Sequence, residues 1–298
     1  MSSGAYFMRP SNPEFVMSQL SQIVDWGSLM VGESQGYKGE NVKVAILDTG
    51  CSLEHPDLKD AIFTFKDMSG GNKTDGDGHG THVAGIIGAR ANDTGILGVA
   101  PSCQIGVYKV LSDSGWGEYE WFVKAIYAAL EDGCQIFNMS LGTNEEPTLA
   151  VRNAIEEAKR AGCLMFAASG NDGRGVPESG DAVDFPARWP EVVAVGSVER
   201  NKEHSNFSSP GPSVALCAPG RDIYSCWPNT GYAVLTGTSM ATPFVTGVAA
   251  VYWSYFAQQN GEAKIADLVL DRMQKDAQDL GAPGKDPFYG YGLVSIKI

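Results

Sequence analysis

The chain has 298 residues, 43% of them hydrophobic and 19% charged, a composition typical of a globular protein. Its net charge of −13 argues against nucleic acid as a partner, because the phosphates would be repelled. No apolar run approaches the roughly 20 residues that span a bilayer, so we expect no membrane partner either.

The first 26 residues show little apolar periodicity and contain Pro10 and Pro13, so they are predicted to form an N-terminal extension. From residue 27 to residue 298, short apolar runs alternate with helical patterns, and we expect one domain. The predicted strands are residues 42–47, 104–110, 136–139, 164–168 and 192–195. The predicted helices are residues 79–89, 118–130, 148–161 and 239–256. This alternation predicts an α/β fold of three layers, αβα, with a central and mainly parallel sheet.

Six cysteines are scattered through the chain without the CxxC spacing of a zinc or redox motif. Some lie in apolar, strand-like runs, as Cys163 does, and are predicted to be buried, reduced thiols. The N-terminus lacks the apolar segment of a secretory signal. Together these features predict a cytoplasmic protein, with the mature domain of a longer precursor as the alternative.

Three short segments carry an acid, an imidazole and a hydroxyl among glycines and small residues. Asp48 lies in AILDTG (45–50), His79 in DGHGTHVAG (77–85) and Ser239 in GTSMATP (237–243). Taken singly, they could be a turn residue, a loop histidine and a helix N-cap. A serine nucleophile needs a base within hydrogen-bond reach, and that base needs an orienting carboxylate. The three segments together therefore predict a catalytic triad.

In the chain order Asp, His, Ser, these segments resemble the subtilisin-like serine proteases, the subtilases, and the resemblance covers about residues 20–298. It implies a serine endopeptidase in which residues 27–298 form the catalytic domain. Ser239 would attack the scissile carbonyl, His79 would transfer the proton, and Asp48 would orient the imidazole. His82, in the same motif, is expected to be structural.

The segment AASGNDG (167–173) is similar to the subtilase segment that supplies a side-chain amide to the oxyanion hole. The resemblance implies that Asn171 and the backbone N–H of Ser239 stabilise the tetrahedral intermediate. A turn residue would be the ordinary interpretation of an asparagine among glycines.

Two segments resemble the subtilase edges that pair with an extended peptide substrate, and Gly170 is expected beside them. The first edge consists of Ser140, Leu141 and Gly142, and the second of Gly115, Trp116 and Gly117. Trp116 is larger than the residue usual there, so a distal pocket would be narrower or more apolar. A surface turn with an incidental tryptophan is the alternative for the second edge.

Asp184 precedes Phe185 and Pro186, where the resemblance places the floor of the S1 pocket. A carboxylate in a narrow pocket favours arginine or lysine at P1 through charge-assisted hydrogen bonds. Asp172 would lie near the rim. Because this loop is about two residues longer than in common subtilisins, a solvent-facing Asp184 is the alternative.

The resemblance also implies a structural calcium ion, whose ligands are carboxylate, amide and carbonyl oxygens. Asp57 and Asn92 match the side-chain ligands, and Arg90, Thr94 and Ile96 would supply carbonyls. In the family the N-terminal arm supplies a further ligand, which the sequence pattern does not identify.

The acidic balance, Cys51 directly after the aspartate segment, and the short extension resemble intracellular subtilisins. A mature or excised domain of a secreted or multidomain subtilase is the alternative. Two other classes stay open: a catalytically silent binding module, and a peptide ligase or macrocyclase that uses the same acyl-enzyme. The oligomeric state is left open.

Residues 6–10 of the extension, YFMRP, are predicted to be extended and to pair with the edge at residues 140–142. With Arg9 in an acidic S1 pocket, Pro10 would follow the scissile bond and make it resist attack. The extension would then be a tethered inhibitor, and a simply disordered terminus is the alternative.

Overall fold

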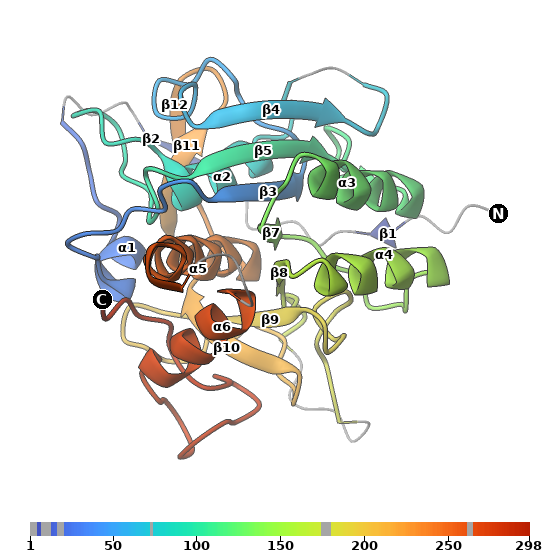
Figure 1. Cartoon of the computed structure of the whole chain (residues 1–298), viewed down its shortest axis with the longest axis vertical. Helices are drawn as coiled ribbons and strands as arrows, with labels where there is room; N and C mark the ends of the chain where they lie inside the picture. The colour runs from blue at the N-terminus through green and yellow to red at the C-terminus, as the bar shows by residue number, and fades with distance from the viewer. Residues whose placement is uncertain (1–4, 7–12, 17–20, 72–73, 174–179, 261–264) are drawn as a thin grey trace.

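A seven-stranded parallel sheet forms the centre of the protein, as a computed structural model of residues 5–6, 13–16, 21–71, 74–173, 180–260 and 265–298 describes it (Figure 1). The strand order is β10-β9-β8-β7-β3-β5-β4. Its strands are β3 (Lys43–Asp48), β4 (Ile62–Asp67), β5 (Gln104–Lys109), β7 (Ile136–Met139), β8 (Leu164–Ala168), β9 (Val193–Val198) and β10 (Val214–Pro219).

Helices cover both faces of this sheet. One face packs against α2 (His79–Gly88) and α5 (Thr238–Asn260), the other against α3 (Tyr119–Glu131) and α4 (Leu149–Arg160). The short α1 (Trp26–Val31) and α6 (Ile265–Asp276) pack against α5 (Figure 1). The predicted three-layer αβα fold is therefore confirmed.

Residues 44–47 of β3, an interior strand of the sheet, are all apolar because both faces of the sheet are covered. Val44 and Ile46 belong to the core shared with α2 and α5, whereas Ala45 and Leu47 belong to the core on the α3 and α4 side. Successive side chains of a strand point to opposite faces of the sheet. A strand in a sheet that is covered by helices on both faces therefore needs an uninterrupted run of apolar residues.

The five predicted strands and four predicted helices match β3, β5, β7, β8, β9 and α2, α3, α4, α5 within a few residues. The sequence missed the edge strands β4 and β10 and the hairpin of β11 (Ile223–Trp227) and β12 (Gly231–Leu235). Strand β4 is only partly buried and carries Lys66 and Asp67, which weakens its apolar pattern.

The N-terminal extension contributes two short strands. Strand β1 (Ala5–Tyr6) pairs antiparallel with β6 (Trp116–Gly117), and β2 (Glu14–Val16) pairs antiparallel with β12. In Figure 1 these strands lie far apart, β1 near α4 and β2 beside the β11–β12 hairpin. The extension is thus tied to the body at two sheet edges.

Two further sequence expectations concern the whole chain. All six cysteines are buried and free, in agreement with the prediction of reduced thiols. Among the described residues, no helix is both long and apolar enough to cross a membrane.

Candidate active site

Asp48 is the last residue of β3 and is fully buried at the carboxyl end of the sheet. Its Oδ1 accepts a hydrogen bond from the backbone N–H of Thr49 at 2.7 Å and lies 2.7 Å from His79 Nδ1. Because carboxyl ends of parallel strands meet at one edge of the sheet, this is where α/β proteins assemble their sites.

His79 is the first residue of α2, and Gly78 precedes it with a φ of 99°. The ring of Trp227 lies directly against Gly78, where a Cβ atom would come within 2.4 Å of it, so only glycine fits. Burial by itself lowers the pKa of His79, but the charge and hydrogen bond of Asp48 outweigh it and raise the pKa. Asp77 and Asp75 add to this effect. An imidazole held by a carboxylate in this way is suited to accept a proton.

Asp75 connects the acid segment to the base segment, and the sequence analysis missed it. Its Oδ1 accepts from Thr49 Oγ1 and Gly78 N, both at 2.8 Å, and its Oδ2 accepts from Thr81 N at 2.8 Å and Thr81 Oγ1 at 2.6 Å. This buried carboxylate therefore fixes the turn that presents His79. The only signal in the sequence is an acid four residues before the histidine.

Ser239 is the second residue of α5 and is almost fully buried. Its Oγ donates to the carbonyl oxygen of Ser140 at 3.2 Å, so the hydroxyl must rotate before it can donate to His79. Catalytic hydrogen bonds are often loose without substrate and tighten in the complex.

A buried chain of side chains holds the backbone of Ser239. Thr246 Oγ1 donates to Asn138 Oδ1 at 2.8 Å, and Asn138 Nδ2 donates to Ser140 Oγ at 3.0 Å. Ser140 Oγ in turn donates to the carbonyl of Ser239 at 2.8 Å. Strand β7 and helix α5 are thereby fixed to each other beside the nucleophile.

Asn171 follows β8 and lies against the start of α5. Its amide oxygen accepts from both the backbone N–H and the hydroxyl of Thr238, each at 2.9 Å. With the oxygen held in this way, the amide nitrogen is the group left to donate to a ligand.

The two predicted substrate edges lie near these groups. Residues 140–142 follow β7, and residues 115–117 contain β6, which β1 already pairs with. An apolar pocket lies beside Leu141 of the first edge, and its lining also includes Tyr119, Phe122 and Phe185. The ring of Trp116 packs edge-to-face on Trp121 at 5.6 Å rather than lining this pocket.

Asp184 is only 3% exposed, so the solvent-facing alternative is wrong. Its backbone N–H donates to the carbonyl of Ser169 at 2.9 Å, which fixes the segment beside β8. A Cβ atom added to Gly142 would lie 3.3 Å from Asp184 Oδ2, and one added to Gly170 would lie 2.6 Å from the same oxygen. Gly170 has a φ of 109°, and the absence of its side chain leaves room for this carboxylate. Asp184 thus lies between two of the predicted substrate-binding glycines.

The predicted calcium ligands lie close to Gln22, a residue of the N-terminal extension that the sequence analysis did not single out. Gln22 Nε2 donates to the carbonyls of Arg90 at 2.7 Å and Ile96 at 3.0 Å, and lies 3.4 Å from Asn92 Oδ1. Asn92 Nδ2 donates to Asp57 Oδ1 at 3.0 Å.

Thr94 also lies in this cluster. Its backbone N–H and hydroxyl both donate to Asn92 Oδ1, at 3.1 and 3.3 Å. The cluster is built from carboxylate, amide and carbonyl oxygens, the donor set that Ca²⁺ prefers.

His82 lies one turn along α2 and is fully buried. Its Nε2 lies 3.0 Å from the carbonyl of Ile223 and 3.2 Å from that of Ala233, and burial lowers its pKa to about 3. His82 therefore fastens α2 to the β11–β12 hairpin as a neutral imidazole.

Comparisons with known proteins agree with this arrangement. Residues 39–292 match the model of the subtilase family. Subtilisin DY of Bacillus licheniformis is 41% identical over 267 residues, which cover 89% of this chain and 93% of that protein. The major intracellular serine protease of Bacillus subtilis is 44% identical over 230 residues, 74% of this chain and 71% of that protein. The intracellular serine protease of Paenibacillus polymyxa is 42% identical over 221 residues, 72% of this chain and 67% of that protein. The chain belongs to the subtilase family and is a serine endopeptidase.

Proposed function

We propose that Asp48, His79 and Ser239 hydrolyse peptide bonds through an acyl-enzyme. The buried 2.7 Å contact between Asp48 Oδ1 and His79 Nδ1, at the first residue of α2, is the observation that carries this proposal. Asp48 keeps the proton of the imidazole on Nδ1, so Nε2 is free to accept the proton of Ser239.

The reaction then proceeds in two halves. Ser239 Oγ attacks the scissile carbonyl while His79 takes its proton, and the imidazolium is stabilised by Asp48. His79 returns the proton to the leaving amine, and a water molecule repeats the sequence on the acyl-enzyme. Asn171 Nδ2 and the backbone N–H of Ser239 stabilise the oxyanion of each tetrahedral intermediate.

A fluorophosphonate probe tests this assignment. The full chain should be labelled at Ser239, and the Ser239→Ala variant should be neither labelled nor active. Peptidase activity retained in that variant would refute the triad. The product mixture from one peptide separates hydrolysis from ligation or cyclisation, and absence of labelling in the parent protein would favour a binding module.

For specificity, we propose that the S1 pocket prefers arginine or lysine. Asp184 is buried between Gly142 and Gly170, two residues expected to line that pocket. A carboxylate shielded from water forms stronger hydrogen bonds to a guanidinium or ammonium group than an exposed one does. Asp172, near the expected rim, adds negative charge on the approach.

We propose that residues 1–26 are an extension that restrains a catalytic domain of residues 27–298. The pairing of β1 with β6 supports this, because β6 lies in one of the two expected substrate edges and a substrate would compete for the same backbone groups. The predicted partner was the other edge, residues 140–142, so the described pairing differs from the expectation. Arg9 and Pro10 lie outside the described residues.

Deletion of residues 1–18 tests the restraint. It removes β1 and β2 and leaves Gln22 in place, so the calcium cluster should be unaffected. The truncated protein should cleave a small peptide with a higher kcat/KM than the intact chain. Equal values, with the extension verified as intact in the longer protein, would leave the extension without a regulatory role.

We also propose that Gln22, Asp57, Asn92 and the carbonyls of Arg90, Thr94 and Ile96 hold a structural calcium ion. The oxygens of this cluster converge on one amide group, and a half-turn of the Gln22 amide replaces a donor by an acceptor there. When bound, the ion would neutralise Asp57 and fix the loop to the start of the domain.

A cytoplasmic location is our proposal for this protein. It is supported by six free, buried cysteines and by the names of two relatives, both of which are intracellular serine proteases.

A further inference from the structure

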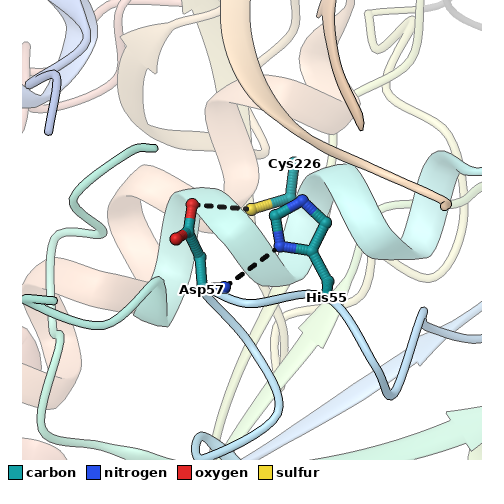
Figure 2. A group of neighbouring side chains, drawn as sticks. All are labelled: His55, Asp57 and Cys226. Carbon is teal, nitrogen blue, oxygen red and sulfur yellow. Dashed lines mark hydrogen bonds between the residues drawn. The ribbon is translucent and has the colours of Figure 1, made fainter. Parts of the chain in front are cut away.

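Three side chains with different metal-binding chemistry meet on the side of Asp57 that faces away from Asn92. His55 and Asp57 belong to the loop after β3, and Cys226 belongs to β11 (Figure 2). All three are fully buried, and their ligand atoms lie within 4.8 Å of one another. They bring one nitrogen, one oxygen and one sulfur donor to a single point.

The tautomer of His55 is fixed by its surroundings. Nε2 lies 3.0 Å from the carbonyl oxygen of Gly231, which can only accept, so Nε2 carries the proton. Nδ1 therefore keeps its lone pair, which accepts only a long hydrogen bond of 3.2 Å from the backbone N–H of Asp57. A ring N–H that donates to a backbone carbonyl is the usual arrangement of a metal-binding histidine.

The gap between sulfur and oxygen also suits an ion. Cys226 Sγ lies 3.9 Å from Asp57 Oδ2, a weak contact for a thiol donor (Figure 2). In a tetrahedral zinc site with a Zn–S bond of about 2.3 Å and a Zn–O bond of about 2.0 Å, the two donor atoms lie about 3.5 Å apart. A shift of a few tenths of an ångström would bring these two atoms to that spacing.

We propose that His55, Asp57 and Cys226 form a binding site for Zn²⁺ or a similar thiophilic divalent cation. On binding, the thiol of Cys226 releases its proton to solvent and the cation takes its place between Sγ and Oδ2. The thiolate of Cys226 offsets one of the two positive charges, and the carboxylate of Asp57, whose Oδ1 faces the calcium cluster, lies between the two proposed cations. The mixture of nitrogen, oxygen and sulfur donors favours Zn²⁺ over Ca²⁺ and Mg²⁺.

The site differs from the calcium cluster, although they share one carboxylate. Asp57 Oδ1 accepts from Asn92, whereas Oδ2 faces Cys226 and also accepts from Tyr232 Oη at 2.9 Å and from Ile96 N at 3.0 Å. A cation on the Oδ2 side would link the loop after β3 to the β11–β12 hairpin. That hairpin also holds α2, since Ser225 Oγ donates to the carbonyl of His82 at 2.7 Å.

Cobalt provides a direct test, because Co²⁺ bound to a thiolate has a charge-transfer band in the near ultraviolet that oxygen and nitrogen ligands do not produce. The full chain carrying Ser239→Ala, to prevent autolysis, is stripped of metals and titrated with Co²⁺ in excess Ca²⁺. We expect a band that saturates at one equivalent and disappears when Zn²⁺ is added.

Cys226→Ser should abolish the band, and His55→Gln should weaken Co²⁺ binding at least tenfold. Cys103→Ser, which alters another fully buried thiol outside the cluster, should leave the band unchanged. In the same background, Zn²⁺ should raise the Tm of the parent protein by several degrees and leave the Tm of Cys226→Ser unchanged.

Two results would overturn the proposal, and the first does not depend on whether a Cys226 or His55 variant folds. One is the absence of a charge-transfer band in the parent protein. The other is a band that survives Cys226→Ser, which would place the cation on another cysteine.

Discussion

The carboxylate of Asp75 offers the sharpest test of how this site is held together, through the change Asp75→Asn. The two oxygens of Asp75 each accept one backbone N–H, from Gly78 and from Thr81, and one threonine hydroxyl. The hydroxyls can rotate and become acceptors, but the backbone N–H groups cannot. Whichever way the asparagine amide turns, its NH₂ group meets a backbone donor.

The expected loss follows from these contacts. At least one charge-assisted hydrogen bond disappears and one buried N–H is left without an acceptor, which together cost about 3 kcal/mol. The free energy of unfolding should fall by that amount, measured with a chemical denaturant in the Ser239→Ala background with Ca²⁺ present.

A second effect of Asp75→Asn concerns His79. Asp75 is one of the negative charges that raise the pKa of His79, after Asp48 and Asp77. Removing its charge lowers that pKa, so more of the histidine is neutral at acidic pH. The acidic limb of kcat/KM, where activity falls as the base becomes protonated, should therefore move to lower pH.

Asp77→Asn is the matched control, because it removes another carboxylate near His79 from a position that is only partly buried. It should shift the acidic limb in the same direction with a much smaller loss of stability. The role assigned to Asp75 is wrong if Asp75→Asn lowers the free energy of unfolding by less than about 1 kcal/mol and leaves the acidic limb of kcat/KM at the same pH as in the parent protein.

Three further predictions concern the predicted site residues. Asn171→Ala should lower kcat by about 10²- to 10³-fold with little change in KM, measured on a peptide substrate; a change below about tenfold would remove Asn171 from the oxyanion hole. For two substrates that differ only at P1, Asp184→Asn should reduce the kcat/KM of the arginine substrate relative to that of the leucine substrate by about 10- to 100-fold. That change corresponds to the loss of one charge-assisted hydrogen bond. A parent enzyme that already prefers leucine would refute the basic pocket. Removal of calcium with EDTA should lower the Tm of the intact chain and have a smaller effect on Asp57→Asn, and equal shifts would contradict the calcium site.

The sequence predicted the parts of the site that lie in short, contiguous segments. Asp48, His79, Ser239 and Asn171 each stand next to small residues and a strand or helix boundary, so their neighbours in the chain were informative. Strand β3 and helix α2 were predicted for the same reason, since an unbroken apolar run and a motif-bearing helix leave a strong local pattern.

The missed features depend on contacts between distant segments. Gln22 reaches Arg90 and Ile96 across about seventy residues, and nothing near it in the chain indicates that role. Asp75 lies in a run of glycines and acids that is typical of an exposed turn. In the folded protein, however, the side chain is buried and accepts four hydrogen bonds. The burial of Asp184 likewise depends on how a long loop folds back on Gly142 and Gly170.

The junction between extension and domain bears on the proposed restraint, because the contacts that hold the start of the domain lie after β1 and β2 in the chain. Ile23 pairs with Ile96, and the backbone N–H groups of Gln22 and Ile23 donate to the carbonyls of Asp93 and Gly95. The end of the extension is therefore joined to the loop around residues 93–96 by Gln22 and Ile23, which follow β1 and β2 in the chain. Cleavage between residues 16 and 22 would break the covalent link from β1 and β2 to the domain and leave the contacts of Gln22 and Ile23 intact. The truncation at residue 18 therefore removes the proposed restraint together with the β2–β12 pairing, and leaves the contacts of Gln22 and Ile23 with the loop around residues 93–96 in place.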